Sequence, residues 1–313
     1  MTTLEIMGQN AKAASRVLMN AGAKKDSALL AIADALRANA DKIIEANNID
    51  IENGRAAGLT ESLIDRLMLD KGRIDGMAKG VEEVAAQADP IGKIIEGRTL
   101  KNGLKIEKVT VPMGVIGIIF EARPNVTSDA AALCMKAGSA VILRGGKEAI
   151  NSNTAIAEVM RDAIESAGLP RDCVQLITDT TRQSATELMQ LTDYLDVLIP
   201  RGGAGLIKSV VNNAKVPVIE TGVGNCHVYV DKTADLDMAK NIVYNAKTSR
   251  PSVCNAIETV LVHQDIAEKA LPLIKAELDK KNVEIRGCER TSAILGDCVI
   301  PASEDDYAKE FLD

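Results

Sequence analysis

The residue best suited to chemistry in this sequence is Cys254, which lies in a short polar turn marked by Pro251. An apolar, β-branched run follows directly, so the turn is predicted to stand where a strand begins and fixes the thiol. A reactive cysteine needs partial exposure and nearby positive charge that favours the thiolate, and Lys247 and Arg250 are candidates to supply it. The pattern predicts a nucleophile, and the alternative is an ordinary small core residue.

A second candidate is Asn125, in a polar segment directly after the apolar run 115–120. That run has the pattern of a buried strand, and open parallel sheets bind ligands outside the carboxyl ends of their strands. An Asn on the following loop can donate its amide to a developing oxyanion. It can equally cap a turn or a helix, and the local sequence favours neither interpretation.

Two glycine-rich segments follow later strands and suit a phosphate. Arg144-Gly145-Gly146-Lys147 comes after the apolar run 140–143, with two cations beside glycines that permit close backbone approach. Pro200-Arg201-Gly202-Gly203 leads into a predicted helix, whose free N–H groups and dipole favour an anion. Neither segment is a dinucleotide fingerprint at its usual place or a P-loop. Together they predict a nucleotide or another phosphorylated ligand.

Two other pairings of residue types are weaker. Cys226 and His227 look like a nucleophile and its base, but neighbours on a strand point to opposite faces. Glu220 ends the apolar run 216–219, where it is either a general base beside a cleft or an exposed carboxylate. We therefore expect no catalytic dyad at Cys226 and leave both interpretations of Glu220 open.

The periodicity along the sequence predicts an α/β protein. Residues 1–89 have helical spacing, and Asn102-Gly103 predicts a β-hairpin over about 97–111. Short apolar runs then alternate with helical stretches, which is typical of a parallel sheet covered on both faces. The predicted strands are 115–120, 140–143, 174–177 and 197–199, with a second series at 226–230 and 256–262 and a helix at 265–279.

Composition bounds the class of protein. A length of 313 residues suggests about two domains. The net charge of -7 argues against nucleic acid as a partner, and no apolar run is long enough to predict a membrane span. Six scattered cysteines and two histidines form no metal-ligand spacing, so we expect no metal and free thiols in a reducing cytoplasm.

Four segments, in this order, resemble one known family: VPMGVIGIIFEARPN (111–125), ILRGGKE (142–148), IETGVGNCH (219–227) and RPSVCNA (250–256). They closely resemble the γ-glutamyl phosphate reductases (glutamate-5-semialdehyde dehydrogenases), a proline-biosynthesis branch of the aldehyde dehydrogenase superfamily. The resemblance covers essentially the whole sequence, and the motifs around Asn125 and Cys254 are specific to this branch.

The resemblance implies a reaction and roles for the catalytic residues. Cys254 is the thiolate that forms a thioester with L-glutamyl 5-phosphate, and NADPH reduces that thioester to give L-glutamate 5-semialdehyde. Asn125, with the backbone N–H of Cys254, resembles the oxyanion hole. Arg123 and Arg250 are hypothesised to grip the phosphate or α-carboxylate of the substrate, because Arg presents a bidentate fork to such groups.

The resemblance also implies the cofactor site. Arg144-Gly145-Gly146-Lys147 matches the segment that holds the adenosine ribose, and Lys147, where NAD-dependent members typically have an acidic residue, fits the 2′-phosphate of NADPH. Gly202 and Gly203 match the helix start on the pyrophosphate side. Glu220 falls where hydrolytic members keep their base; a thioester-reducing enzyme does not need to activate water for that purpose, and Glu220 is grouped with the cofactor-binding residues.

The implied architecture is a Rossmann-type NADP-binding domain with N-terminal helices over 1–220, an oligomerisation hairpin within it, and a catalytic domain over 221–313. Family members continue past residue 313, so the catalytic domain is expected to be partial and the sequence to be truncated at its C-terminus. A homo-oligomer and a functional link to glutamate 5-kinase are expected. The alternatives are a CoA-acylating or other aldehyde dehydrogenase, and an inactive nucleotide-binding fragment.

Overall fold

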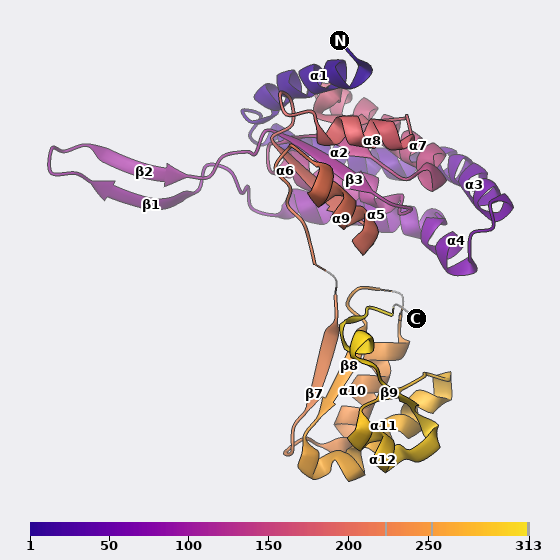
Figure 1. Cartoon of the computed structure of the whole chain (residues 1–313). Helices are drawn as coiled ribbons and strands as arrows, with labels where there is room; N and C mark the ends of the chain where they lie inside the picture. Colours follow the sequence, from indigo (N-terminus) through magenta and orange to yellow (C-terminus); the bar gives the residue numbers. More distant parts are fainter. Residues whose placement is uncertain (223, 252, 312–313) are drawn as a thin grey trace. The chain divides into compact units, whose positions relative to one another are not determined.

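The computed structural model describes residues 1–222, 224–251 and 253–311. It divides into two compact units, Met1–Thr221 and Gly222–Asp313 (Figure 1). Each unit has a parallel pair or sheet with helices packed against it, as the alternation of apolar runs and helical spacing predicts.

The core of the first unit is a four-stranded parallel sheet in the order β5-β4-β3-β6. The strands are β3 (Val115–Phe120), β4 (Ala140–Arg144), β5 (Val174–Leu176) and β6 (Val197–Arg201). Beside β6, Val218 forms a single parallel bridge with Leu198, so the apolar run 216–219 borders the sheet without forming a full strand. The four strands predicted in this region are confirmed.

Helices cover both faces of this sheet because β3 is apolar on both. Ile116, Ile118 and Phe120 face one apolar cluster, while Val115 and Ile119 face another, in the strict alternation of a strand. The first cluster is closed by α2 (Lys24–Ala38), α5 (Lys71–Ala86), α6 (Asn125–Lys136) and α7 (Ile150–Ser166), and the second by α1 (Thr3–Leu18), α8 (Arg182–Met189) and α9 (Ala204–Asn213). Helices α3 (Ala40–Ala56) and α4 (Glu61–Leu67) pack at the margin of the first layer.

Two buried lysines join the helices of the first layer. Lys25 and Lys136 are 2% and 4% exposed, and each Nζ pairs with a carboxylate, that of Asp89 at 2.8 Å and that of Asp26 at 2.6 Å. Each Nζ also donates to a backbone carbonyl, that of Lys136 at 3.1 Å and that of Ala85 at 2.8 Å. These bonds offset the cost of burying the charges, which is large for an unpaired ion.

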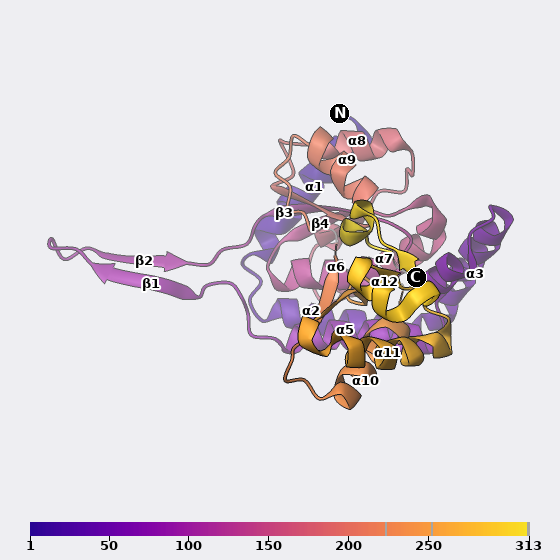
Figure 2. The same ribbon diagram turned by 60° about the horizontal axis from the view of Figure 1, so that its bottom comes forward.

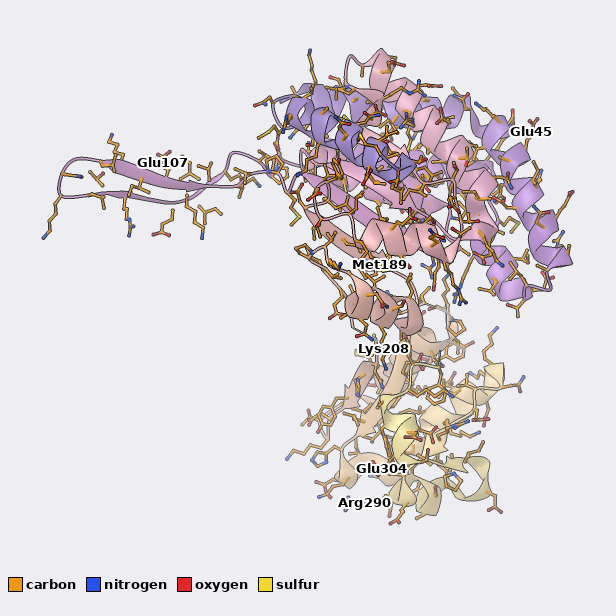
Figure 3. All side chains as sticks on the ribbon, turned by 45° about the horizontal axis from the view of Figure 1, so that its top comes forward. Glu45, Glu107, Met189, Lys208, Arg290 and Glu304 are labelled. Atoms are coloured by element: carbon orange, nitrogen blue, oxygen red, sulfur yellow. The ribbon has the colours of Figure 1, made fainter. Side chains whose placement is uncertain are left out.

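The predicted hairpin is confirmed, with strands β1 (Ile94–Thr99) and β2 (Lys105–Val109). Gly103 adopts the left-handed conformation (φ 86°) that its turn requires. Every residue of both strands is exposed, and the hairpin projects away from the rest of its unit in two views (Figures 1 and 2). Figure 3 shows its side chains, Glu107 among them, standing free on both sides of the ribbon.

The second unit pairs β7 (Cys226–Val230) with β8 (Ile257–Val262) in parallel. Helices α10 (Leu236–Thr248) and α11 (Ala267–Leu278) pack on this pair around Val230, Val243 and Ile274. A short parallel pair, β9 (Arg286–Gly287) and β10 (Ile300–Pro301), flanks α12 (Glu289–Leu295). The strands and the long helix predicted for this region are confirmed.

Gly117, in the middle of β3, tests how tightly the second layer packs. A Cβ at Gly117 would lie 2.8 Å from Leu198 Cδ1 and 2.9 Å from Leu195 Cδ1, closer than side chains pack. We expect Gly117→Ala to lower the free energy of unfolding by about 1–3 kcal/mol through overpacking. A Cβ at Gly76, in α5, would have no neighbour within 4 Å, so Gly76→Ala should raise that free energy by roughly 0.5–1 kcal/mol. Urea unfolding of both variants checks the pair, and equal effects would contradict the packing described for β3.

Candidate active site

The polar segments of the first unit follow strands that end at one edge of the sheet. Strands β4 and β5 lie on one side of β3 and β6 lies on the other, so the strand order reverses between β3 and β6. Open α/β sheets bind their ligands at such a switch point, beyond the carboxyl ends of the strands. The residues after β3, β4 and β6 are therefore the ones whose geometry matters.

Asn125 is not on a loop, as the sequence suggested, but is the first residue of α6, after the N-cap Pro124. The alternative of a capping Asn is also wrong. The side chain is exposed, and its Nδ2 donates to Asp129 Oδ2 at 2.9 Å, one helical turn further on. The polar residue Asp129 was missed in the sequence, although its spacing of four from Asn125 was available as a signal.

Arg144 closes the end of β4 onto a neighbouring loop. Its Nη2 donates to the carbonyls of Thr180 and Thr181 at 2.7 and 2.9 Å, and burial lowers the pKa of the guanidinium. The side chain is thus committed to the loop between β5 and α8. Lys147, three residues further on, is exposed.

The glycines between these cations have a packing role. A Cβ at Gly145 would lie 2.2 Å from Nδ2 of Asn153, and one at Gly146 would lie 2.6 Å from Oε2 of Glu148. The amide of Asn153 is fully buried, its Oδ1 accepts from Thr127 at 3.0 Å, and its Nδ2 has no hydrogen-bond partner among the described residues. Close backbone approach is therefore required here by the fold itself.

The start of α9 already holds an anion from the protein. The backbone N–H of Gly203 donates to Glu121 Oε2 at 3.0 Å, and a Cβ at Gly202 would lie 2.6 Å from the carboxylate carbon of Glu121. The sequence predicted an anion at this helix start, and the side chain found there is an acidic residue 82 positions earlier. Glu121 was missed as a participant, and its place directly after a buried strand was the available signal.

The remaining predicted residues of this unit are exposed. Arg123 lies on the segment that joins β3 to α6, where its N–H donates to the carbonyl of Glu121 at 2.7 Å. Glu220 follows Ile219, whose N–H donates to the carbonyl of Leu198 at 3.0 Å. Glu220 is thus placed beyond the carboxyl-terminal side of the sheet border.

In the second unit, Cys254 is exposed on the turn between α10 and β8, as predicted. The N–H of Ala256 donates to the carbonyl of Val253 at 3.0 Å, which closes a turn with Cys254 inside it. Lys247, expected to lend charge to the thiol, is paired instead with the largely buried Glu258 at 3.2 Å. Arg250 is exposed, and it directly follows Ser249 at the end of α10.

The residues at and just before the start of β7 support the Cys254 turn. The thiol of Cys226 donates to the carbonyl of Cys254 over 3.5 Å, and a Cβ at Gly224 would lie 2.8 Å from that same oxygen. Asn225 donates to the carbonyl of Tyr307 and accepts from Thr259, both at 2.9 Å. His227 is exposed with Nδ1 2.6 Å from the carbonyl of Asn225.

Metal ligation and membrane insertion find no support among the described residues. No cluster of three or more His, Cys, Asp or Glu side chains in the described part of the protein is arranged to hold a metal ion. No helix within the same residues is long and apolar enough to cross a membrane.

Comparison with known proteins places the chain in a family of enzymes. The aldehyde dehydrogenase family matches residues 3–294, so the chain belongs to that family. A γ-glutamyl phosphate reductase of Clostridium novyi is 59% identical over 289 residues, covering 92% of this chain and 69% of that protein. One of Clostridium perfringens is 54% identical over 311 residues, covering 99% of this chain and 75% of that protein. Within the family, this chain is a member of the γ-glutamyl phosphate reductases, and the resemblance drawn from its motifs is confirmed.

Solved structures agree with this placement. The crystal structure of γ-glutamyl phosphate reductase from Thermotoga maritima matches with a TM-score of 0.94 at 47% identity, covering 100% of this chain and 75% of that one. The Saccharomyces cerevisiae enzyme of the same name matches with a TM-score of 0.66 at 35% identity, covering 94% of this chain and 74% of that one. The aldehyde-dehydrogenase-like α/β fold is therefore established.

The environments of the cysteines differ enough to predict their reactivity. Burial raises the pKa of Cys134 to about 12 and likewise that of Cys173 to about 12. The hydroxyl of Thr291 lies 3.4 Å from the thiol of Cys288, and hydrogen bonding to the thiolate lowers the pKa of Cys288. Cys254 is exposed. Alkylation acts on the thiolate, so reactivity follows exposure and pKa.

We expect iodoacetamide at neutral pH to label Cys254 and Cys288 in the native protein and to leave Cys134 and Cys173 unlabelled. A lowered pKa keeps the Cys288 thiolate populated at lower pH, so its labelling rate should rise at a lower pH than that of the same thiol in unfolded protein. Peptide mass spectrometry over a pH series measures both effects. Labelling of Cys134 as fast as Cys254 would contradict the described burial.

Proposed function

We propose that this chain reduces L-glutamyl 5-phosphate to L-glutamate 5-semialdehyde and phosphate with NADPH, as a step of proline biosynthesis. The observation that carries the proposal is the exposed Cys254 thiol on a turn held by backbone contacts, in a chain of this family. An exposed thiol on a fixed turn can attack an acyl carbon, and covalent catalysis divides a difficult reduction into two easier steps.

The proposed reaction begins at the Cys254 sulfur. The thiolate attacks the γ-acyl carbon of the substrate, a C–S bond forms, and the C–O bond to phosphate breaks to leave a thioester. NADPH, when bound, supplies the hydride that reduces this thioester. Cys254 then leaves the resulting thiohemiacetal as a thiolate, which releases the aldehyde and restores the nucleophile.

Asn125 and the backbone N–H of Cys254 are the proposed donors to the oxygen that gains charge in both steps. Donors held in place before the reaction are worth more than mobile ones, because no reorganisation is needed as charge develops. One N–H of the Asn125 amide is bonded to Asp129, and the second N–H is proposed to donate to this oxygen.

The residues at the strand ends fit a dinucleotide. The carboxylate of Glu121 at the N–H of Gly203 supports an anion-binding role for the start of the ten-residue helix α9, as a pyrophosphate would require. Gly202 and Gly203 are proposed to face the pyrophosphate, and Arg144-Gly145-Gly146-Lys147 the adenosine ribose, with Arg144 fixing the segment and Lys147 reaching the 2′-phosphate. Glu220 is proposed to lie beside the bound cofactor.

Several further assignments belong to the proposal. Arg123 and Arg250 are exposed and are proposed to bind the phosphate or α-carboxylate of the substrate. The projecting hairpin β1–β2 is proposed to mediate homo-oligomer formation, since an isolated two-stranded ribbon is marginal by itself. A cytoplasmic location suits the six free thiols, and glutamate 5-kinase is the proposed functional partner that supplies the acyl phosphate.

The reaction is tested in reverse on the purified protein, by following NADPH formation from NADP, phosphate and glutamate semialdehyde. We expect turnover that requires phosphate and is abolished by Cys254→Ala, because the thioester cannot form without the thiol. Acetaldehyde with CoA in place of semialdehyde and phosphate is the control for a CoA-acylating enzyme. Turnover without phosphate, or in Cys254→Ala, would overturn the proposal. The two arginines are tested separately: if Arg123→Ala or Arg250→Ala leaves KM and kcat unchanged, the arginine replaced in that variant does not bind the substrate.

Lys147 tests the choice of NADPH over NADH. A hydrogen bond to a charged group contributes about 1.5–3 kcal/mol, so Lys147→Ala should raise the KM for NADP about tenfold or more and leave the KM for NAD nearly unchanged. Lys71→Ala, at an exposed lysine paired with Asp41, is the matched control. Equal changes for both nucleotides would show that Lys147 does not read the 2′-phosphate.

A further inference from the structure

We propose that Asp129 is a positioning residue that holds the side-chain amide of Asn125 in the orientation needed to stabilise an oxyanion. The inference rests on the proposed function, because it assigns a cause to the direction in which Asn125 donates. The contacts on which it rests all lie within the first unit.

The two side chains form a hydrogen bond across one helical turn. Asn125 and Asp129 are four residues apart on α6, which places them on the same face of the helix, and Nδ2 of Asn125 lies 2.9 Å from Oδ2 of Asp129. A primary amide is planar and carries two N–H bonds. When one of them points at the carboxylate, the direction of the other is fixed.

The hydrogen bond also selects which end of the amide faces each way. Rotating the Asn125 amide by half a turn would bring its carbonyl oxygen against the carboxylate, where two acceptors repel. The same rotation would also exchange the positions of the amide nitrogen and the carbonyl oxygen, so that the reacting oxygen would face the carbonyl instead of an N–H donor. The carboxylate therefore suppresses the unproductive orientation of an otherwise exposed side chain at the first position of the helix.

The carboxylate of Asp129 is partly enclosed and accepts hydrogen bonds from its neighbours. It is half-buried, and burial raises the pKa of its carboxyl, whereas hydrogen bonds from Asn125 and Ser128 and the charge of Arg201 on β6 lower it. Gly80 of α5 leaves room for the carboxylate, since even a Cβ at Gly80 would lie 4.0 Å from Oδ1. A half-buried carboxylate that accepts hydrogen bonds from two neighbouring side chains has a more defined orientation than a surface water molecule would have.

The alternative is that Asp129 serves only the stability of α6. The two roles predict different measurements. Loss of a purely structural role lowers the unfolding temperature and predicts no particular division of the effect between kcat and KM. A positioning role changes kcat with little change in substrate KM, and its loss has no further effect once Asn125 is gone.

A double-mutant cycle in the reverse reaction on the purified protein measures this difference. We expect Asn125→Ala to lower kcat about 10²-fold or more, as for other oxyanion donors, and Asp129→Leu to lower it about 10- to 100-fold through misplacement. The double variant should be no slower than Asn125→Ala alone. Asp129→Asn, whose side-chain oxygen still accepts from Asn125, should recover most of the lost kcat.

Full additivity in the cycle would overturn the proposal, as would Asp129→Asn being no faster than Asp129→Leu. An Asp129→Leu variant without loss of kcat, beside a slow Asn125→Ala, would overturn the positioning role and leave the oxyanion role standing. An unimpaired Asn125→Ala would instead show that the oxyanion role in the proposed function has failed, and the present inference with it.

A measurement without turnover covers the case in which a variant unfolds or is inactive. With ¹⁵N-labelled asparagine, the side-chain amide signals of Asn125, assigned by their loss in Asn125→Ala, should shift as the pH falls through the raised pKa of Asp129. Those shifts should be absent in Asp129→Asn. Amide signals that do not respond to pH in the unaltered protein would overturn the hydrogen bond on which the inference depends.

Discussion

The complete burial of β3 is the constraint on which the first unit depends. Its six residues are enclosed, with alternate side chains in two different apolar clusters, so the strand cannot slip by one residue without reversing both layers. The register of β4 and β6 on either side is set against it. The segments that follow Phe120, Arg144 and Arg201 therefore lie at one edge of the sheet in positions fixed by the strand register. The geometry of the site proposed there depends on that register.

At that edge, groups that could bind a dinucleotide already form hydrogen bonds within the protein. Glu121 occupies the N–H of Gly203, and Arg144 is spent on the carbonyls of Thr180 and Thr181. In the proposed function, a pyrophosphate and the Glu121 carboxylate have the same sign of charge and exclude each other at α9. Binding of the cofactor must then displace the Glu121 carboxylate into water. The net binding free energy at α9 is therefore the difference between the interactions of two anions with the helix start, and it is smaller than the interaction of the pyrophosphate alone.

The elements could be predicted from the sequence because their signals are local. Apolar runs located the parallel strands, Asn102-Gly103 located the hairpin, and the polar turn before an apolar run placed Cys254 correctly on an exposed turn. The partners of the site residues could not be predicted, because they come from distant positions. Glu121 reaches Gly203 across 82 residues, and Arg144 reaches Thr180 across 36. Asn125 was misplaced on a loop for a local reason, since Pro124 begins a helix at once after a very short connection.

The support of Cys254 explains why charge near a cysteine in sequence is a poor guide to its environment. Lys247 is on the last turn of α10 and pairs with Glu258 on β8, whose side chain is nearly buried. A buried carboxylate is costly without a nearby cation, whereas an exposed thiol is solvated by water. The ion pair joins the two elements on either side of the turn, and the carbonyl of Cys254 is held separately by the thiol of Cys226 and the bare backbone at Gly224. The turn is thus fixed through its backbone, which leaves the Cys254 side chain exposed and free to form and break a covalent bond.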